Sequence, residues 1–188
     1  MTKQELIKEI DGKIDIAHSC IEAGYIFGSK MWVEGAKNYV TPGLMYNDDG
    51  KVVFMTKSPQ ELVLKYYDPV NAEEMGHNLT KLGISDMITQ TFELISKYCK
   101  ESKQEAILES FPWFHFARII RNSISHLYNV EIGHYNGKVV PNQKLQFSDR
   151  EIEITKLMHG NEFDYKIFPI EYSFELVDMM KASLVDLN

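Results

Sequence analysis

The residues best suited to chemistry lie in one short stretch, residues 114–130. The chain has 188 residues and three arginines, and two of these, Arg118 and Arg121, lie in this stretch. Placed on a helix at 100° per residue, the polar side chains gather within about 80° of Arg118. They are His115, Arg121, Asn122, Ser125, His126, Tyr128 and Asn129. The opposite side carries Phe116, Ile119, Ile120, Ile124, Leu127 and Val130, and Phe114 is the one apolar residue on the polar side.

The composition of this polar face favours a functional role. Faces that only contact water are usually rich in Lys, Glu and Asp, and none of these occurs in residues 111–129. The side chains present instead bind anions, titrate near neutral pH or orient their neighbours. An amphipathic helix whose polar face is simply hydrated remains the alternative explanation.

The elements that must position this face are mostly helical. Apolar residues recur at helical spacing in several segments, and Ser58-Pro59-Gln60-Glu61 has the residues of a helix start. The predicted helices cover 4–36, with Gly12 and Gly24 as weak points, then Ser58 to just before Asp68, 71–81, 85–98, 103–109, 110–130 and 171–187. Pro112 is tolerable only in the first turn of the arginine-bearing helix, so that helix is expected to begin near Ser110.

Two regions have the pattern of β-hairpins. Residues 44–46 and 52–55 flank the turn-forming cluster Asn47-Asp48-Asp49-Gly50. Residues 138–140, 145–147, 151–157 and 163–168 are β-rich, with turn residues at Ser148-Asp149 and Gly160-Asn161. The sequence therefore predicts a mainly α protein, an up-and-down helical bundle with small antiparallel β-hairpin insertions near 44–55 and 138–168, in a single domain spanning 1–188.

Charge and composition exclude several classes of protein. The apolar fraction of 44% and charged fraction of 25% are those of a globular protein. The net charge of −7 argues against a surface that is basic throughout, so an anion-binding region should be confined to the arginine-bearing helix and its neighbours. We expect no secretory signal and no membrane span, hence a cytoplasmic protein. Cys20 and Cys99 are expected to be buried free thiols.

The stretch Arg121-Asn122-Ser123-Ile124-Ser125-His126-Leu127-Tyr128 resembles the HEPN signature, an Arg and a polar residue followed by three variable residues and His. It also resembles the Arg-x4-His-x-Tyr form found in HEPN toxins that are paired with a nucleotidyltransferase antitoxin. The chain is longer than the compact toxins, and its hairpins are additional to the minimal bundle. The resemblance implies a metal-independent endoribonuclease without cofactors, a toxin or defence protein that acts on RNA as a homodimer with a shared cleft.

The residue types suit that hydrolase-like reaction on RNA. Cleavage through the 2′-hydroxyl needs a proton acceptor or donor, which His126 supplies, and a cation for the phosphorane charge, which Arg121 supplies. Asn122, one turn before His126, is placed to orient the imidazole. Arg121 and His126 lie about 140° apart on an ideal helix, which favours a site shared by two subunits.

Three further residues are assigned to substrate binding: Arg118, Ser125 and Tyr128. Arg118 extends the anion-binding surface or forms a surface or interface salt bridge. Tyr128 stacks on a base, is the hydroxyl that an antitoxin modifies, or lies at the rim of an interface. His115 lies outside the motif, and a structural role is favoured for it.

Two alternatives remain open. The first is a non-catalytic HEPN protein that uses the same cleft to bind RNA, a nucleotide or a protein partner. The second, more remote, is a di-iron carboxylate bundle, because Glu74-Met75-Gly76-His77 and Glu131-Ile132-Gly133-His134 both have the Glu-x-x-His spacing. A glycine in each pair and the position of the second at a helix end make rigid ligands unfavourable.

Overall fold

The structure is a computed structural model, and it describes residues 1–28, 44–46, 52–55, 69–125, 130, 134–135, 138–139, 142–161 and 168–187. Most of these residues are helical, which confirms the predicted fold class at the level of a mainly α protein. The chain divides into two compact units, Met1–Ala17 with Ile84–Asn188, and His18–Gly83. No helix in the described part of the chain is both long enough and apolar enough to cross a bilayer.

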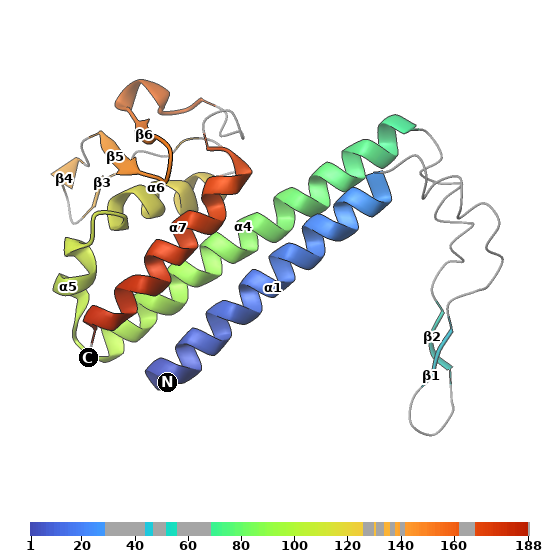
Figure 1. Cartoon of the computed structure of the whole chain (residues 1–188), viewed down its shortest axis with the longest axis horizontal. Helices are drawn as coiled ribbons and strands as arrows, with labels where there is room; N and C mark the ends of the chain where they lie inside the picture. Colours follow the sequence, from blue (N-terminus) through green and yellow to red (C-terminus); the bar gives the residue numbers. More distant parts are fainter. Residues whose placement is uncertain are drawn as a thin grey trace. The chain divides into compact units, whose positions relative to one another are not determined.

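In the first unit, parts of three helices lie side by side: α1 (Lys3–Gly28), α4 (Pro69–Glu101) and α7 (Ile170–Ala182) (Figure 1). Ion pairs connect them, with Lys13 Nζ 3.2 Å from Asp86 Oδ2 and Lys181 bonded to Asp11. The two chain ends lie together, since Lys3 donates to the carbonyl of Leu187. These links place the amino-terminal part of α1 against both α4 and α7.

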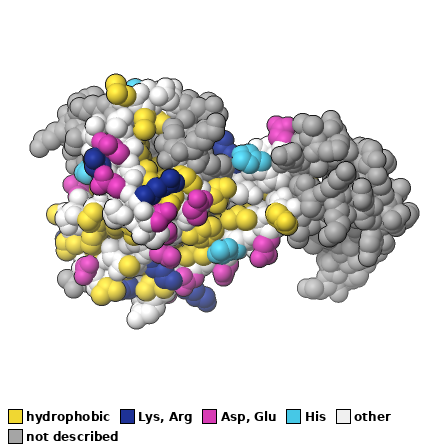
Figure 2. Space-filling view, turned by 45° about the horizontal axis from the view of Figure 1, so that its top comes forward, with side chains coloured by type: hydrophobic (Ala, Val, Ile, Leu, Met, Phe, Trp, Pro, Cys, Tyr) yellow, Lys and Arg dark blue, Asp and Glu magenta, His cyan; other side chains and the backbone are white. Residues whose placement is uncertain are grey.

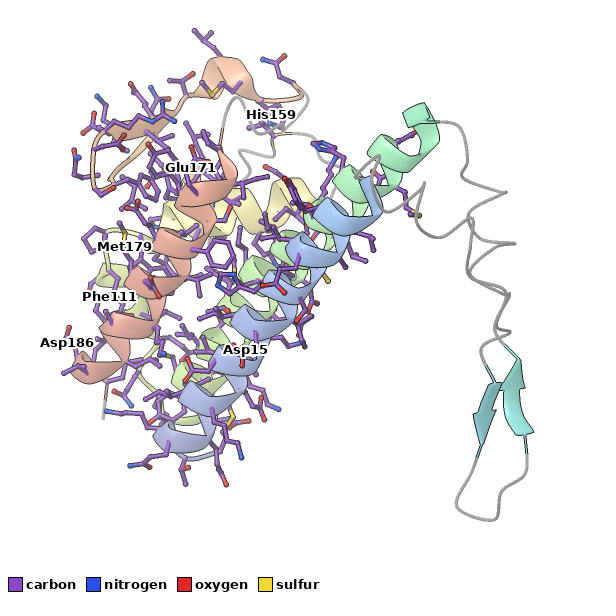
Figure 3. All side chains as sticks on the ribbon, turned by 45° about the vertical axis from the view of Figure 1, so that its right-hand side comes forward. Asp15, Phe111, His159, Glu171, Met179 and Asp186 are labelled. Carbon is purple, nitrogen blue, oxygen red and sulfur yellow. The ribbon has the colours of Figure 1, made fainter. Side chains whose placement is uncertain are left out.

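The apolar stripes predicted for these helices form the core. Leu6, Ile10 and Ala17 of α1 are fully buried, as are Met87 and Ile95 of α4. Side chains of α1, α4 and α7 fill the space between the helices in Figure 3, where Asp15 labels α1 and Met179 labels α7. The α1 helix continues through Gly12 and Gly24, so neither glycine interrupts it. The residues of the predicted 4–36 helix beyond Gly28 lie outside the described residues.

The structure corrects the prediction of two helices at 71–81 and 85–98, because α4 is one continuous helix of 33 residues. A single glycine such as Gly83 costs roughly 1 kcal/mol in a helix interior, and burial of the stripe around it compensates. The helix ends where Lys103 adopts a left-handed conformation with φ 58°. Lys103 N donates to Lys100 O (3.3 Å) and Gln104 N to Cys99 O (2.7 Å), the bond pair of a Schellman motif.

The arginine-bearing helix starts later than predicted. Residues 105–110 form the short helix α5 (Glu105–Ser110), which begins two residues after the predicted 103–109 segment, and α6 (Phe114–Ser125) follows. Phe111 is extended (φ −68°, ψ 136°) because the ring of Pro112 excludes the helical conformation from the preceding residue. Pro112 therefore separates two helices instead of lying in the first turn of one.

The predicted end of this helix at Val130 is also wrong. Val130 is not helical: its N–H donates to Asn161 O (2.8 Å), and its carbonyl accepts from Gly160 N (2.9 Å). Both of its backbone groups are thus satisfied by a distant turn, in which Gly160 has φ +78°. Residues 126–129 lie outside the described residues.

The described residues include three antiparallel pairs of strands. They are β1 (Leu44–Tyr46) with β2 (Val52–Met55), β3 (His134–Tyr135) with β4 (Lys138–Val139), and β5 (Gln143–Gln146) with β6 (Glu151–Ile154). The pairing of β1 with β2 agrees with the hairpin predicted near 44–55, although its turn at Asn47–Gly50 lies outside the described residues. Phe147 N donates to Arg150 O (2.9 Å), which confirms the turn at Ser148-Asp149.

The β-rich region differs from the prediction in detail. The strand predicted for 151–157 stops at Ile154, and η1 (Lys156–Met158) is a short 3₁₀ helix. Of the strand predicted for 163–168, only Phe168 is described, and it is a buried residue outside any strand. The last predicted helix, 171–187, is confirmed as α7 with the 3₁₀ turn η2 (Ser183–Asp186). The helix predicted from Ser58 lies outside the described residues.

An aromatic cluster packs against the apolar side of α6. The Phe116 ring lies 5.9 Å from that of Phe147, at the hairpin turn, and 5.8 Å from that of Phe168. Phe147 also packs on Tyr172 of α7 (5.0 Å). Since Phe116 is fully buried in this cluster, the opposite side of α6 turns toward α4 and α5.

Candidate functional site

A pocket of about 550 Å³ lies where α4, α5 and α6 meet. Its lining includes Arg118, Arg121 and Asn122, three of the residues predicted from the sequence. The other lining residues are Phe92, Glu93, Ser96, Lys100, Glu105, Leu108, Glu109 and Phe114. The volume is within the range of roughly 300–1,000 Å³ that is usual for small-ligand sites.

Phe114, the apolar exception on the polar side of α6, forms part of this pocket. Its ring stacks on that of Phe92 at a centroid distance of 5.6 Å and an interplanar angle of 27°. Trp113 approaches the same Phe92 ring edge-on at 6.5 Å. These contacts join the start of α6 to α4, so that the two arginines one and two turns later lie beside α4.

Arg121 is held by two polar contacts. One Nη2 hydrogen bond reaches Glu93 Oε1 on α4, and Nη1 donates to Asn122 Oδ1 at 3.0 Å. The side chains of Arg121 and Glu93 are 34% and 46% exposed, so the pair lies at the mouth of the pocket and in contact with solvent. A guanidinium has five N–H donors, which leaves others for a ligand.

Arg118 is more enclosed than a residue of a hydrated face, with only 8% of its surface exposed. A guanidinium stays charged even when it is buried. Arg118 therefore supplies a fixed positive charge to the inner part of the pocket.

His115 precedes Arg118 by one turn and is half-buried. Burial, together with the positive charge of Arg118, lowers the pKa of His115 below its usual 6.5, and Glu109 partly opposes the shift. His115 is therefore neutral near pH 7. It is not among the residues that line the pocket, consistent with the structural role favoured for it.

The remaining predicted residues lie elsewhere. Ser125 is exposed, does not line the pocket, and donates from Oγ to the carbonyl of Arg121 at 3.0 Å. His126, the predicted proton-transfer residue, and Tyr128, the predicted base-stacking residue, lie outside the described residues. The carbonyl oxygen of Asn122 accepts from Arg121, and the expected role of Asn122 in orienting His126 stays a prediction.

Sequence reasoning missed the acidic side of the site. Glu93 on α4 and Glu105 and Glu109 on α5 line the pocket and balance the charges of Arg118, Arg121 and Lys100. The spacing of Glu105 and Glu109, four residues apart, placed them on one face, but no local pattern showed that this face meets α6.

Cys99 is buried as expected, whereas Cys20 is only partly buried, which corrects the expectation of two buried thiols. Burial raises the pKa of the Cys99 thiol to about 11, so the nucleophilic thiolate is scarce near neutral pH. No group of three or more His, Cys, Asp and Glu side chains within the described ranges is placed to hold a metal ion. Glu74 and His77, half of the Glu-x-x-His pattern, are exposed, and Glu131 lies outside the described residues.

Basic residues do not gather into one extended patch on the face that Figure 2 shows. Described Lys and Arg side chains lie there beside Asp and Glu. This mixture of charges agrees with the net charge of −7. In comparisons with known proteins, the chain matches no protein-family model, no curated protein and no solved structure.

Proposed function

We propose that this protein is a metal-independent endoribonuclease of the HEPN type. The observation that carries the proposal is that Arg118, Arg121 and Asn122, from one face of α6, line one pocket of about 550 Å³. Two guanidinium groups three residues apart on one helix can contact the non-bridging oxygens of a single phosphate. The buried position of Arg118 strengthens its attraction for that phosphate.

In this proposal, the 2′-hydroxyl of RNA loses its proton and attacks the adjacent phosphorus, and the bond from phosphorus to the 5′-oxygen of the next nucleotide breaks. The products are a 2′,3′-cyclic phosphate and a 5′-hydroxyl, whose oxygen takes up a proton as it leaves. His126 accepts or delivers the proton, and Arg121 stabilises the charge of the phosphorane. Glu93 and Asn122 hold the Arg121 side chain through two hydrogen bonds, and the Glu93 carboxylate competes with phosphate for the guanidinium.

The angular separation of Arg121 and His126 on a helix supports a cleft shared by two copies of the chain. Tyr128 is proposed as a contact for RNA or as the target of a nucleotidyltransferase-type antitoxin. A homodimer in light scattering at micromolar concentration is expected. A monomer there would remove the shared cleft from the proposal.

The test is RNA cleavage by the full chain in the presence of EDTA. Arg121→Ala and His126→Ala should each lower the cleavage rate by roughly 100-fold or more. Arg150→Ala is the matched control, because Arg150 stacks over the ring of Tyr172 at 4.7 Å and does not line the pocket. Cleavage at the parental rate by folded Arg121→Ala and His126→Ala variants would refute the proposal.

A non-catalytic binding protein is the second candidate, and one observation favours it. Three glutamates line the pocket, and one of them already pairs with Arg121, which reduces the positive charge that could stabilise a phosphorane. Such a protein would bind a nucleotide or RNA and leave it intact, and it would lose binding in Arg118→Ala. Incubation of bound RNA for hours without shortening would support this candidate over the nuclease.

A further inference from the structure

The α5 side of the pocket is acidic. Glu105 and Glu109 are four residues apart, so they project from the same face of the short α5 helix, and both line the pocket together with Leu108. Like charges at this spacing destabilise a helix, and no cation lies between them in the sequence. Glu105 lies in the first turn of α5, where the helix dipole favours a negative charge, but local helix stability does not explain Glu109.

The α6 side of the same pocket is basic. Arg118 and Arg121 line it, and α4 adds Lys100 together with Glu93, which is paired with Arg121. The pocket thus has a cationic wall on α6 and an anionic wall on α5. Its best ligand has an anionic group at one end and hydrogen-bond donors at the other.

We infer that the pocket takes a guanine nucleotide of RNA, with its phosphate on Arg118 and Arg121 and its base edge on Glu105 and Glu109. This inference rests on the proposed function and specifies its substrate. The Watson–Crick edge of guanine presents N1–H and N2–H donors side by side, and a carboxylate with two acceptor oxygens matches both. Uracil presents a single N3–H between two carbonyl oxygens that a carboxylate repels, and adenine and cytosine each present one amino group, so none of them offers two adjacent donors.

The apolar part of the pocket agrees with a base of this kind. Leu108 and Phe114 are almost completely buried where they line it, and the Phe114 ring is already stacked on Phe92. These side chains offer apolar contact to the flat base, while the donors at its edge select among bases.

The experiment is calorimetric titration of the full chain with 5′-GMP, 5′-IMP, 5′-AMP and 5′-UMP. GMP should bind at least about tenfold more tightly than UMP, because a matched bidentate contact discriminates to this extent or more. IMP, which keeps N1–H and lacks the 2-amino group, should fall between them. Equal affinity for all four nucleotides would overturn the inference.

The variants are Glu105→Gln, Glu109→Gln and the double variant. The double variant should weaken GMP binding about tenfold or more and should not weaken UMP binding, because each amide has one acceptor oxygen where the carboxylate has two, and only guanine uses both. Glu101→Gln is the matched control, since Glu101 is an exposed carboxylate at the end of α4 and does not line the pocket. An unchanged GMP preference in a folded double variant would also overturn the inference.

RNA cleavage by the same proteins separates this inference from the proposed function. Cleavage without guanine at the cut site would refute the guanine subsite and leave the nuclease proposal standing. Selective GMP binding without cleavage of any RNA would refute the nuclease and support the guanine subsite. Failure to bind any nucleotide would refute the guanine subsite whatever the cleavage result.

Discussion

Arg121 on α6 and Glu93 on α4 form an ion pair at the mouth of the pocket, and Arg121 also donates to Asn122 Oδ1 at 3.0 Å. The pair joins two helices that are 28 residues apart in the sequence at this position. It places a carboxylate beside the guanidinium that we propose to bind phosphate. The effect of that carboxylate can be measured directly.

Glu93→Gln should increase anion binding, because the glutamate competes with phosphate for Arg121. The free energy of unfolding should fall by less than about 1 kcal/mol, since both side chains are partly exposed and water screens the pair. Inorganic phosphate titration and urea unfolding would measure the two effects.

The control for this change is Asp86→Asn, which removes the ion-pair partner of Lys13. Asp86 lies on α4, seven residues before Glu93, and does not line the pocket. It should affect stability similarly and leave phosphate binding unchanged. Weaker phosphate binding in Glu93→Gln would show instead that Glu93 mainly orders Arg121.

Gly24 and Gly12 form a matched pair in α1. A Cβ at Gly24 would lie 2.4 Å from the carbonyl oxygen of Gly76 and 2.7 Å from Thr80 Oγ1, whereas one at Gly12 meets nothing within 4 Å. Gly24→Ala should therefore destabilise the packing of α1 on α4 in the His18–Gly83 unit, by roughly 1–3 kcal/mol.

Gly12→Ala should do the opposite and raise the free energy of unfolding by about 0.5–1 kcal/mol, because alanine restricts the unfolded chain more than glycine. Thermal unfolding followed by circular dichroism would compare both variants with the parent. Equal stability of the two variants would contradict the close approach of the helices at Gly24.

Lys103 holds a left-handed conformation, with φ 58°, at the end of α4. This conformation costs an L-residue with a Cβ roughly 1–2 kcal/mol and costs glycine almost nothing. Lys103→Gly should therefore stabilise the chain by up to about 1 kcal/mol, after the greater entropy of glycine in the unfolded state is subtracted. Lys100→Gly, inside the helix, should be destabilising, and urea unfolding of both variants checks the difference.

His115 should make the stability depend on pH. Burial and Arg118 lower its pKa in the folded state below the usual 6.5, so the unfolded chain binds the proton more tightly. The contribution of neutral His115 is complete above pH 6.5 and is lost as the pH falls toward and below the folded-state pKa. Urea unfolding between pH 5 and pH 7.5 should therefore show stability rising with pH.

His115→Gln should flatten this pH dependence, and exposed His18→Gln serves as its control. The same slope in parent and His115→Gln would assign the pH dependence to other groups. The test needs no assumption about activity, because His115 does not line the pocket.

The sequence by itself determined the helical character of the chain and which face of most helices is buried. Leu6, Ile10 and Ala17 recur at helical spacing and are fully buried, since the period of the helix alone decides which side chains share a face. The turn at Ser148-Asp149 was equally local. The helical period also predicted the polar face of α6, and three residues of that face line one pocket.

Only the tertiary structure decided what that face meets. Contacts between elements that are distant in the sequence decided three features. They bring Glu93, Glu105 and Glu109 to the pocket, they bury Arg118, and they pair Val130 with Gly160-Asn161. The period of one helix does not specify which helix packs against it, because packing is set by the shapes of both surfaces. The late start of α6 has a local cause, because Pro112 restricts the backbone of Phe111. The sequence allowed Pro112 either in the first turn of a helix or at a break between two helices. The packing of Trp113 and Phe114 on Phe92 favours the break.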